Sequence, residues 1–488
     1  MQILGRKKYI VLRKKHAHLH MSKKSSNFAG KRRKPKPKAE KMEPVCAIST
    51  AYGTGGIAVI RVSGEGSIAI VDTLFRGRTT LRDAKANSVH YGRIERVSEV
   101  LDEVVCTVFR APHSFTGEDT VEIACHGSLF IQQELVRWLI DAGCKAAEPG
   151  EFTRRAFLNG KMDLAQAEAV ADLIAAQSKA EKELALSQLR GAVSNELGVL
   201  RERLLHFTSL VELELDFADH EELEFADRTE LKALAAEIEG KLGGLMASFR
   251  TGNAIKNGVS VAIIGAPNVG KSTLLNALLG EERAIVSDIQ GTTRDTIEDT
   301  LVIDGILFRL IDTAGMRATE DELENMGIER SRHAIERAQI IVYVRDNGGK
   351  DDALLNEEMM KGTVIPVLNK IDLYSVSDER SVLWQQRGLI PISAKNGEIE
   401  PLRRELVRVA KESMQTSAVM LSNARHYEAV SRAHEAIIRV QEGLENGLSG
   451  ELLSMDLQDC LSALGEVTGQ ITNQEVLANI FSKFCIGK

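Results

Sequence analysis

The residues Gly265-Ala266-Pro267-Asn268-Val269-Gly270-Lys271-Ser272 decide the fold of the middle of this chain. They follow an apolar run, Val259 to Ile264, and precede a helical pattern from Lys271 to Leu279. In a loop with this G-x-x-x-x-G-K-S spacing, backbone N–H groups point at phosphate oxygens, Lys271 reaches the outer phosphates, and Ser272 offers its hydroxyl to Mg²⁺. The positive end of the following helix faces the same anion. Because a chance glycine-rich turn would need neither the strand nor the helix, we expect a nucleotide-phosphate site.

Two further motifs suit the terminal phosphate of a nucleotide. Asp312-Thr313-Ala314-Gly315 ends the apolar run Ile306 to Ile311. A carboxylate at this strand end can hold Mg²⁺ through water, and a glycine N–H there can meet the phosphate. The polar segment Gly291-Thr292-Thr293-Arg294-Asp295 carries a hydroxyl, on Thr293, that can complete the metal shell, so its position predicts a switch loop.

Two more motifs identify the base. Asn369-Lys370-Ile371-Asp372 follows the apolar run Val364 to Leu368, and Ser393-Ala394-Lys395 follows Leu389 to Ile392. A carboxylate at Asp372 can accept two N–H bonds from guanine, whereas adenine cannot satisfy it. Five motifs in this order, most of them at strand ends, predict a guanine-nucleotide domain over residues 257–412 with a doubly wound parallel sheet.

The residue after the Asp312 motif is Met316, where many GTPases carry a glutamine that orients the attacking water. A thioether cannot do this, so another group must supply the chemistry. The following loop offers four acids that could polarise water: Glu320, Asp321, Glu322 and Glu324.

Asn268, inside the phosphate loop, has two interpretations. Its carbonyl oxygen could bind a monovalent cation beside the phosphates, where a positive charge could replace an arginine finger. It could equally be a loop-stabilising amide.

Composition places the chain in a broad class. Its 488 residues suggest about three domains. With 43% hydrophobic and 27% charged residues, it contains no apolar stretch long enough to span a bilayer. The six cysteines are scattered without C-x-x-C spacing, which favours a reducing cytosol, and we expect a cytoplasmic protein.

Residues 1–41 carry fifteen Lys and Arg residues and one acid, Glu40, although the net charge of the whole chain is −7. We expect this basic extension to be disordered. It could be a nucleic-acid tether, an organelle-targeting peptide, or the product of a gene start placed too far upstream of Met42. We favour the last alternative, because an organised strand pattern begins soon after Met42.

From Val45 to about Glu148, strand patterns alternate with helical ones, which predicts a small α/β domain. Strands are expected at Ile57 to Val62, Glu103 to Phe109 and Thr120 to Ala124, with helices at Ser67 to Phe75 and Leu129 to Ala142. Arg61 and Glu122 lie within these strands. A charge in a buried strand needs a partner, so the two are either a structural salt bridge or the lining of a ligand site.

From Asp163 to Phe249 the pattern becomes helical. Leu197, Leu200, Leu204, Phe207 and Val211 repeat at steps of three and four, as in a helix packed against other helices. The same character returns after Pro401. We therefore expect one helical domain made from both segments, with the nucleotide domain inserted between them.

Several long motifs after Met42 resemble the MnmE (TrmE) family of tRNA-modification GTPases. They are the runs Phe115 to Asp119, Pro149 to Lys161, Asp163 to Ala169 and Phe484 to Lys488. The chain departs from the family at Ser128, which follows Cys125-His126-Gly127 where a second glycine is usual.

The resemblance implies a multidomain α/β plus α protein. Its expected parts are a basic extension (1–41), an N-terminal α/β tetrahydrofolate-binding and dimerisation domain (42–160), a discontinuous helical domain (161–256 and 413–488), and an inserted Ras-like P-loop GTPase domain (257–412). It further implies a homodimer whose GTPase domains pair around K⁺. With the flavoprotein MnmG (GidA), such a protein would modify the wobble uridine of certain tRNAs with a carboxymethylaminomethyl or aminomethyl group, using 5,10-methylene- or 5-formyl-tetrahydrofolate.

The motifs and the resemblance together imply the residues of each site. K⁺ would be held by Asn268, Ser287, Ile289 and Thr292, and Mg²⁺ by Ser272 and Thr293. The folate positions are Arg61, Glu122, Lys161 and Lys488, which favours the ligand interpretation of Arg61 and Glu122. The catalytic residues would be Glu324, which orients water, Lys271, and Cys485, whose chemical role the family leaves open. The nucleotide site would consist of Asn268, Val269, Gly270, Lys271, Ser272, Thr273, Ser287, Asp288, Ile289, Gln290, Gly291, Thr292, Thr293, Asp312, Thr313, Ala314, Gly315, Asn369, Lys370, Asp372, Ser393, Ala394 and Lys395.

Two other classes of protein fit parts of the sequence. A ribosome-assembly GTPase would act as an RNA-binding switch, but it predicts an appended RNA-binding module, and the C-terminal segment here is helical and not notably basic. A GTP-driven scaffold would assemble into polymers through its helices. We expect instead a switch in which GTP and K⁺ draw two GTPase domains together and hydrolysis releases them.

Overall fold

The computed structural model describes residues 42–97, 99–216, 228–282, 299–311, 334–346, 362–374, 388–413 and 419–487. The chain divides into two compact units. The first comprises residues 1–161 together with 481–488, and the second comprises residues 162–480. Within the described residues, no helix is long and apolar enough to cross a membrane.

A seven-stranded sheet in the order β3-β4-β5-β6-β2-β1-β7 forms the first unit. The strands are β1 (Val45–Ile48), β2 (Gly55–Ser63), β3 (Phe75–Gly77), β4 (Ser88–Arg96), β5 (Glu99–Phe109), β6 (Thr120–Gly127) and β7 (Lys145–Ala146). All pairs are antiparallel except β1 with β7. The three strands predicted here are confirmed, and Phe75 begins β3 instead of ending a helix.

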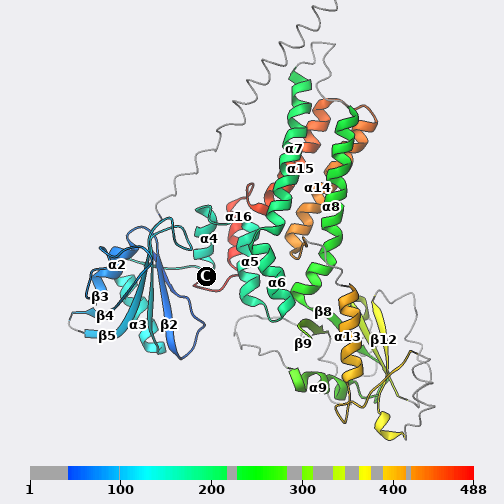
Figure 1. Cartoon of the computed structure of the whole chain (residues 1–488), viewed down its shortest axis with the longest axis horizontal. Helices are drawn as coiled ribbons and strands as arrows, with labels where there is room; N and C mark the ends of the chain where they lie inside the picture. Colours follow the sequence, from blue (N-terminus) through cyan, green and yellow to red (C-terminus); the bar gives the residue numbers. More distant parts are fainter. Residues whose placement is uncertain are drawn as a thin grey trace, which may run out of the picture. The chain divides into compact units, whose positions relative to one another are not determined.

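Two helices, α2 (Ser67–Leu74) and α3 (Leu129–Asp141), cover one face of this sheet (Figure 1). Alternate residues of β2, including Ile60 and Val62, share a core with Val71 of α2 and Leu135 of α3. Because strand side chains alternate between faces, Arg61 lies on the opposite face. A third helix, α4 (Glu151–Leu158), supplies Phe152 to a smaller cluster with Val45 and Ala47 of β1.

The second unit begins with the helices α5 (Leu164–Ala175), α6 (Lys179–Leu189), α7 (Ala192–Asp216) and α8 (Arg228–Asn257). Its other helices near the C-terminus are α14 (Ala424–Glu445), α15 (Gly450–Thr468) and α16 (Gln474–Phe481), of which the last residue belongs to the first unit. Helices α7, α8, α14 and α15 run side by side (Figure 1) and share one core. The predicted seam from Leu197 to Val211 is confirmed, since its five residues are at most 1% exposed. Both chain segments therefore build one helical bundle.

Between these segments lies a six-stranded sheet in the order β13-β12-β11-β8-β10-β9. Its strands are β8 (Val259–Ile264), β9 (Asp299–Ile303), β10 (Ile306–Leu310), β11 (Ile340–Arg345), β12 (Thr363–Leu368) and β13 (Ile390–Pro391). All pairs are parallel except β9 with β10. The helices α9 (Lys271–Glu282), α13 (Glu400–Ser413) and the short η2 (Ile371–Leu373) complete the described part of this region.

Both faces of the central strand β8 are buried. Val261 and Ile263 join one core with Leu274 of α9, whereas Ala262 and Ile264 join another with Ile335. Burial on both faces explains why β8 reads as a continuous apolar run. The predicted fold class, α/β plus α with an inserted P-loop domain, is confirmed. The exact domain boundaries remain predictions.

Candidate nucleotide site

The phosphate loop leaves β8 through a glycine that no other residue can replace without a shift of the backbone. Gly265 has a φ of +151°, and a Cβ atom there would lie 2.0 Å from the carbonyl oxygen of Val344 on the neighbouring strand β11. Gly270, at the start of α9, has a φ of +95°, and its carbonyl accepts the first helical bond from Leu274 N–H at 2.9 Å. The loop is thus fixed to the sheet at one end and to α9 at the other.

Lys271 is held over this loop. Its Nζ donates hydrogen bonds to the carbonyl oxygens of Gly265, at 2.9 Å, and Ala266, at 2.8 Å. Ser272 and Thr273, in the first turn of α9, are exposed. An ammonium group, exposed hydroxyls and the positive end of a helix therefore meet at one place, which suits a phosphate with a bound Mg²⁺.

Asn268 adopts the left-handed backbone conformation, with a φ of +62°, which asparagine tolerates better than most residues. Its side chain is exposed and forms no hydrogen bond with any other residue that the structure describes. The loop-stabilising interpretation therefore rests on the backbone of Asn268 alone, and its amide oxygen is available to a ligand.

Asn369 joins the three loops of the site. Its Nδ2 donates to the carbonyl oxygen of Val269 in the phosphate loop at 2.9 Å, and its Oδ1 accepts from the N–H of Ala394 at 3.0 Å. Asn369 is 2% exposed, so these bonds are shielded from water. The sequence placed Asn369 in a base-recognition motif, but its contact with the phosphate loop required the structure.

The carboxylate predicted to select guanine is held by a hydrogen bond. Asp372 Oδ1 accepts a hydrogen bond from Ser393 Oγ at 2.7 Å. The preceding Lys370 has a φ of +64°, and its Nζ lies 3.1 Å from Asp346 Oδ2. Lys395, two residues after Ser393, is exposed. The structure therefore brings the phosphate loop and both predicted base motifs to one edge of the sheet.

The other predicted nucleotide and metal residues lie outside the described residues. They are Ser287, Asp288, Ile289, Gln290, Gly291, Thr292, Thr293, Asp312, Thr313, Ala314, Gly315 and Glu324, together with Met316 and the other acids of its loop.

Arg61 and Glu122 form a direct pair in the first unit. They stand opposite each other in the β2–β6 register, and Arg61 Nη2 and Nε lie 2.8 and 3.0 Å from Glu122 Oε1. Their side chains are 19% and 30% exposed, so the pair is still accessible. The Arg61 guanidinium also lies 5.4 Å from the ring centroids of Phe115 and Phe152. The salt bridge exists, and it borders an accessible surface that includes the exposed ring of Phe115, whereas Phe152 is fully buried.

Lys161 reaches the same loop that carries Phe115. Its Nζ donates to the carbonyl oxygen of Pro112 at 2.9 Å, and its stem packs against Gly117. Ser128, the departure from the family pattern, precedes α3 with an ordinary extended backbone (φ −71°), so this position does not require glycine. Lys488 lies outside the described residues.

The C-terminal tail docks on the sheet of the first unit. Ser49 Oγ donates to the carbonyl oxygen of Gly487 at 3.1 Å, and the Gly150 N–H approaches the carbonyl oxygen of Cys485 at 3.4 Å. Gly487 has a φ of +92°, and a Cβ atom there would lie 2.1 Å from the carbonyl oxygen of Ile48. The thiol of Cys485 remains exposed.

Sequence reasoning missed a buried polar network beside Arg61. Arg155, 3% exposed, bonds Glu151 at 2.8 Å and Glu118 at 3.2 Å, and Ser63 Oγ donates to Glu118 at 2.9 Å. No helix was predicted over Glu151–Leu158, and no local pattern connects Arg155 with Glu118, 37 residues away in the chain. The network fixes the loop that carries Phe115 to α4.

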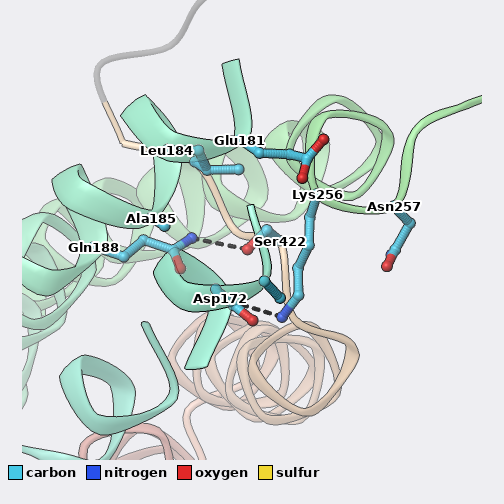
Figure 2. A pocket seen from close by; sticks show the side chains of 9 residues that line it. Asp172, Glu181, Leu184, Ala185, Gln188, Lys256, Asn257 and Ser422 are labelled. Carbon is cyan, nitrogen blue, oxygen red and sulfur yellow. Dashed lines mark hydrogen bonds and ion pairs between the residues drawn. The ribbon is translucent and has the colours of Figure 1, made fainter. Parts of the chain in front are cut away.

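Helix α8 connects the bundle to β8, the strand before the phosphate loop, because only Gly258 separates Asn257 at its end from Val259. Near that end, Lys256 Nζ lies 2.7 Å from Asp172 Oδ2 of α5 (Figure 2). Figure 2 also shows Gln188 of α6, whose Nε2 donates to Ser422 Oγ at 2.9 Å, in the lining of a cavity of about 150 Å³. Burial raises the pKa of Glu181, which lines the same cavity.

Comparison with known proteins decides the family. A family model described as the MnmE helical domain matches residues 164–485, and one described as the GTP-binding protein TrmE N-terminus matches residues 44–161. The chain belongs to the MnmE family. A relative named tRNA modification GTPase MnmE, from Parabacteroides distasonis, is 53% identical and is matched over 100% of its own length and 92% of this chain. The MnmE protein of Porphyromonas gingivalis is 50% identical, over 98% of its length and 91% of this chain.

Among solved structures, the chain is similar to the G domain of the T. maritima FeoB iron transporter. The two are 28% identical, the match covers 32% of this chain and 99% of the FeoB domain, and the TM-score is 0.23.

Proposed function

We propose that this MnmE-family chain hydrolyses GTP to drive modification of the wobble uridine of certain tRNAs. The observation that carries the proposal is the arrangement around Asn369, which ties the phosphate loop to the loop of Ala394 while Ser393 orients the Asp372 carboxylate. GTPase activity and a role in tRNA modification agree with the names of the two MnmE relatives. We also propose that the protein acts in the cytoplasm, in keeping with six scattered cysteines that show no C-x-x-C spacing.

In this proposal, K⁺ and Mg²⁺ complete the nucleotide site. Asn268, whose exposed amide has no other hydrogen bond among the described residues, would hold K⁺ with Ser287, Ile289 and Thr292. Ser272 and Thr293 would hold Mg²⁺ through their hydroxyls. A monovalent cation beside the phosphates supplies the positive charge that an arginine finger supplies elsewhere. Glu324 would orient the attacking water in place of the glutamine that Met316 replaces.

The first unit would bind tetrahydrofolate, which carries the one-carbon group. Arg61, Glu122, Lys161 and Lys488 are the proposed contacts. The residues present fit such a ligand, because the accessible Arg61–Glu122 pair offers both donors and acceptors beside the exposed ring of Phe115. A flat heterocycle with a hydrogen-bonding edge needs both kinds of group.

The proposed assembly is a homodimer that works with the flavoprotein MnmG. Hydrolysis would release paired GTPase domains, and α8 is the proposed route for that motion, since it runs from the bundle core to the strand before the phosphate loop. Cys485, exposed on the docked tail, is proposed to act in the modification and not in GTP hydrolysis.

A variant with altered nucleotide specificity tests this proposal. The purified chain, MnmG, GTP, a tetrahydrofolate donor and a tRNA transcript should together yield modified wobble uridine, measured by mass spectrometry of digested nucleosides. Asp372→Asn exchanges an acceptor for an amide that can pair with xanthine, so this variant should modify tRNA with XTP and lose activity with GTP. Modification that proceeds without any nucleotide, or equal use of GTP by Asp372→Asn, would refute the proposed coupling.

A further inference from the structure

The Phe115 ring lies beside the accessible Arg61–Glu122 pair. It is 38% exposed, whereas Phe152, whose ring centroid lies at the same distance of 5.4 Å from the Arg61 guanidinium, is fully buried. A ring that faces solvent over this much of its surface makes few of the contacts that hold a buried side chain in one rotamer. The position of Phe115 therefore depends on how the loop over residues 112–118 is held.

The residue after Phe115 ties this loop to two other elements. Thr116 is fully buried, and its Oγ1 lies 2.7 Å from Ser63 Oγ of β2. Its carbonyl oxygen accepts a hydrogen bond of 2.8 Å from Asn159 Nδ2, at the C-terminal end of α4. The chain beside Phe115 is thus bound to β2 and to α4 at once.

Glu118 adds an ionic anchor to the same loop. Its Oε2 accepts hydrogen bonds from Ser63 Oγ at 2.9 Å and from Arg155 Nη1 at 3.2 Å. The Arg155 guanidinium also donates to Glu151 Oε1 at 2.8 Å and to the carbonyl oxygen of Glu43 at 2.9 Å. The side chains of Arg155 and Glu118 are 4% and 12% exposed, so water competes little for these bonds. Since a planar guanidinium holds its three partners in fixed directions, the loop has little freedom to shift while Arg155 is in place.

We propose that the Arg155–Glu118 ion pair positions the Phe115 ring and thereby sets the affinity of the first unit for its tetrahydrofolate donor. This inference rests on the folate site of the proposed function, and it adds residues that the four proposed contacts do not include. An aromatic ring held beside Arg61 can stack on a flat heterocycle whose edge meets the Arg61–Glu122 pair. Arg155 and Glu118 are too deeply buried to touch such a ligand, so they act through Phe115 and are positioning residues.

Calorimetric titration of the full chain with 5-formyl-tetrahydrofolate tests the inference. Glu118→Ala releases the loop but leaves Arg155 paired with Glu151, so no buried charge loses its only partner and the chain should fold. This variant should bind the folate about tenfold more weakly. Glu118→Gln keeps an oxygen that can accept from Ser63 and Arg155, so it should bind within about threefold of the wild type.

A double-mutant cycle separates positioning from a general structural effect. Phe115→Ala removes the ring and should itself weaken folate binding. Adding Glu118→Ala should then change the affinity by less than about twofold, because the ring that Glu118 positions is already gone. A merely structural Glu118 would lower the affinity by the same factor with or without the ring. The control is Asp141→Ala, which breaks an exposed ion pair of 2.7 Å with Arg96 in the same unit and should bind within about twofold of the wild type.

Amide hydrogen exchange without ligand gives a second readout. In Glu118→Ala, residues 113–118 should exchange at least about tenfold faster, whereas β2 and β6 should stay unchanged. The inference is overturned if Glu118→Ala binds the folate as the wild type does, if its loss is as large in the Phe115→Ala background, or if exchange rises throughout the sheet. A wild-type chain that does not bind the folate would refute the folate site of the proposed function together with the inference. A wild type that binds while Glu118→Ala is unchanged would remove the inference alone.

Discussion

Replacement of Asn369 by alanine would separate the phosphate loop from the base loop. The amide bonds the Val269 carbonyl at 2.9 Å and the Ala394 N–H at 3.0 Å, and all three residues are at most 4% exposed. Alanine cannot replace either bond, and water has no direct access to the two groups left behind. Each buried unsatisfied group costs about 1–3 kcal/mol, so the total loss is about 2–6 kcal/mol.

This loss divides between the stability of the nucleotide domain and its affinity for nucleotide. If about 2 kcal/mol appears in binding, the Kd for GDP rises about 30-fold. Fluorescence titration with a labelled GDP measures the affinity, and thermal unfolding with and without GDP measures the stability.

The control is Asn396→Ala, in the same loop region, because the Asn396 side chain is exposed and forms no hydrogen bond among the described residues. It should bind GDP within about twofold of the wild type. If Asn369→Ala also binds within twofold and melts unchanged, the three loops are not held together as argued.

Three further outcomes follow from particular contacts. Burial alone would raise the pKa of Glu168, but His426 and Arg425 hold it at about 2, below the ordinary 4.5. The stability that this pairing contributes is therefore present above pH 4.5 and lost as pH falls through 2. Glu168→Gln should lower the free energy of unfolding by about 3 kcal/mol at pH 7 and by only about 1 kcal/mol at pH 3, measured by hydrogen exchange in α5 and α14. Gly487→Ala should release the C-terminal tail and raise amide exchange of its last residues at least about tenfold, whereas Gly447→Ala, with a similar positive φ but nothing within 4 Å of its Cβ, should leave the tail unchanged. Glu324→Ala should slow GTP hydrolysis sharply and leave nucleotide affinity nearly intact in the same titration; a large loss of affinity would make Glu324 structural.

The features that sequence reasoning predicted are local in the chain. The strand before the phosphate loop, the helix after it, and the seam from Leu197 to Val211 each follow from the spacing of a few consecutive residues. The edge at which the motifs of Lys271, Asn369 and Ser393 meet also followed, because parallel strands present their carboxyl ends at the same edge of a sheet.

Features that depend on register or on distant contacts could not be predicted. The residues alone could not decide whether Arg61 and Glu122 form a salt bridge or line a ligand site, because only the β2–β6 register shows that they stand opposite each other. Ser49 and Gly487 are 438 residues apart in the chain, and no local pattern connects them.

Whether a monovalent cation completes the GTPase site can be measured by comparing K⁺ with Na⁺. GTP turnover by the purified chain would be measured in matched K⁺ and Na⁺ buffers, with dimerisation followed in the presence of GDP and aluminium fluoride. We expect rapid turnover and nucleotide-dependent pairing in K⁺ and little of either in Na⁺. The Asn268→Ala variant should turn over GTP at the same rate in both buffers. Equal turnover in the two buffers would contradict the account, because the charge that replaces an arginine finger would then have to come from another group.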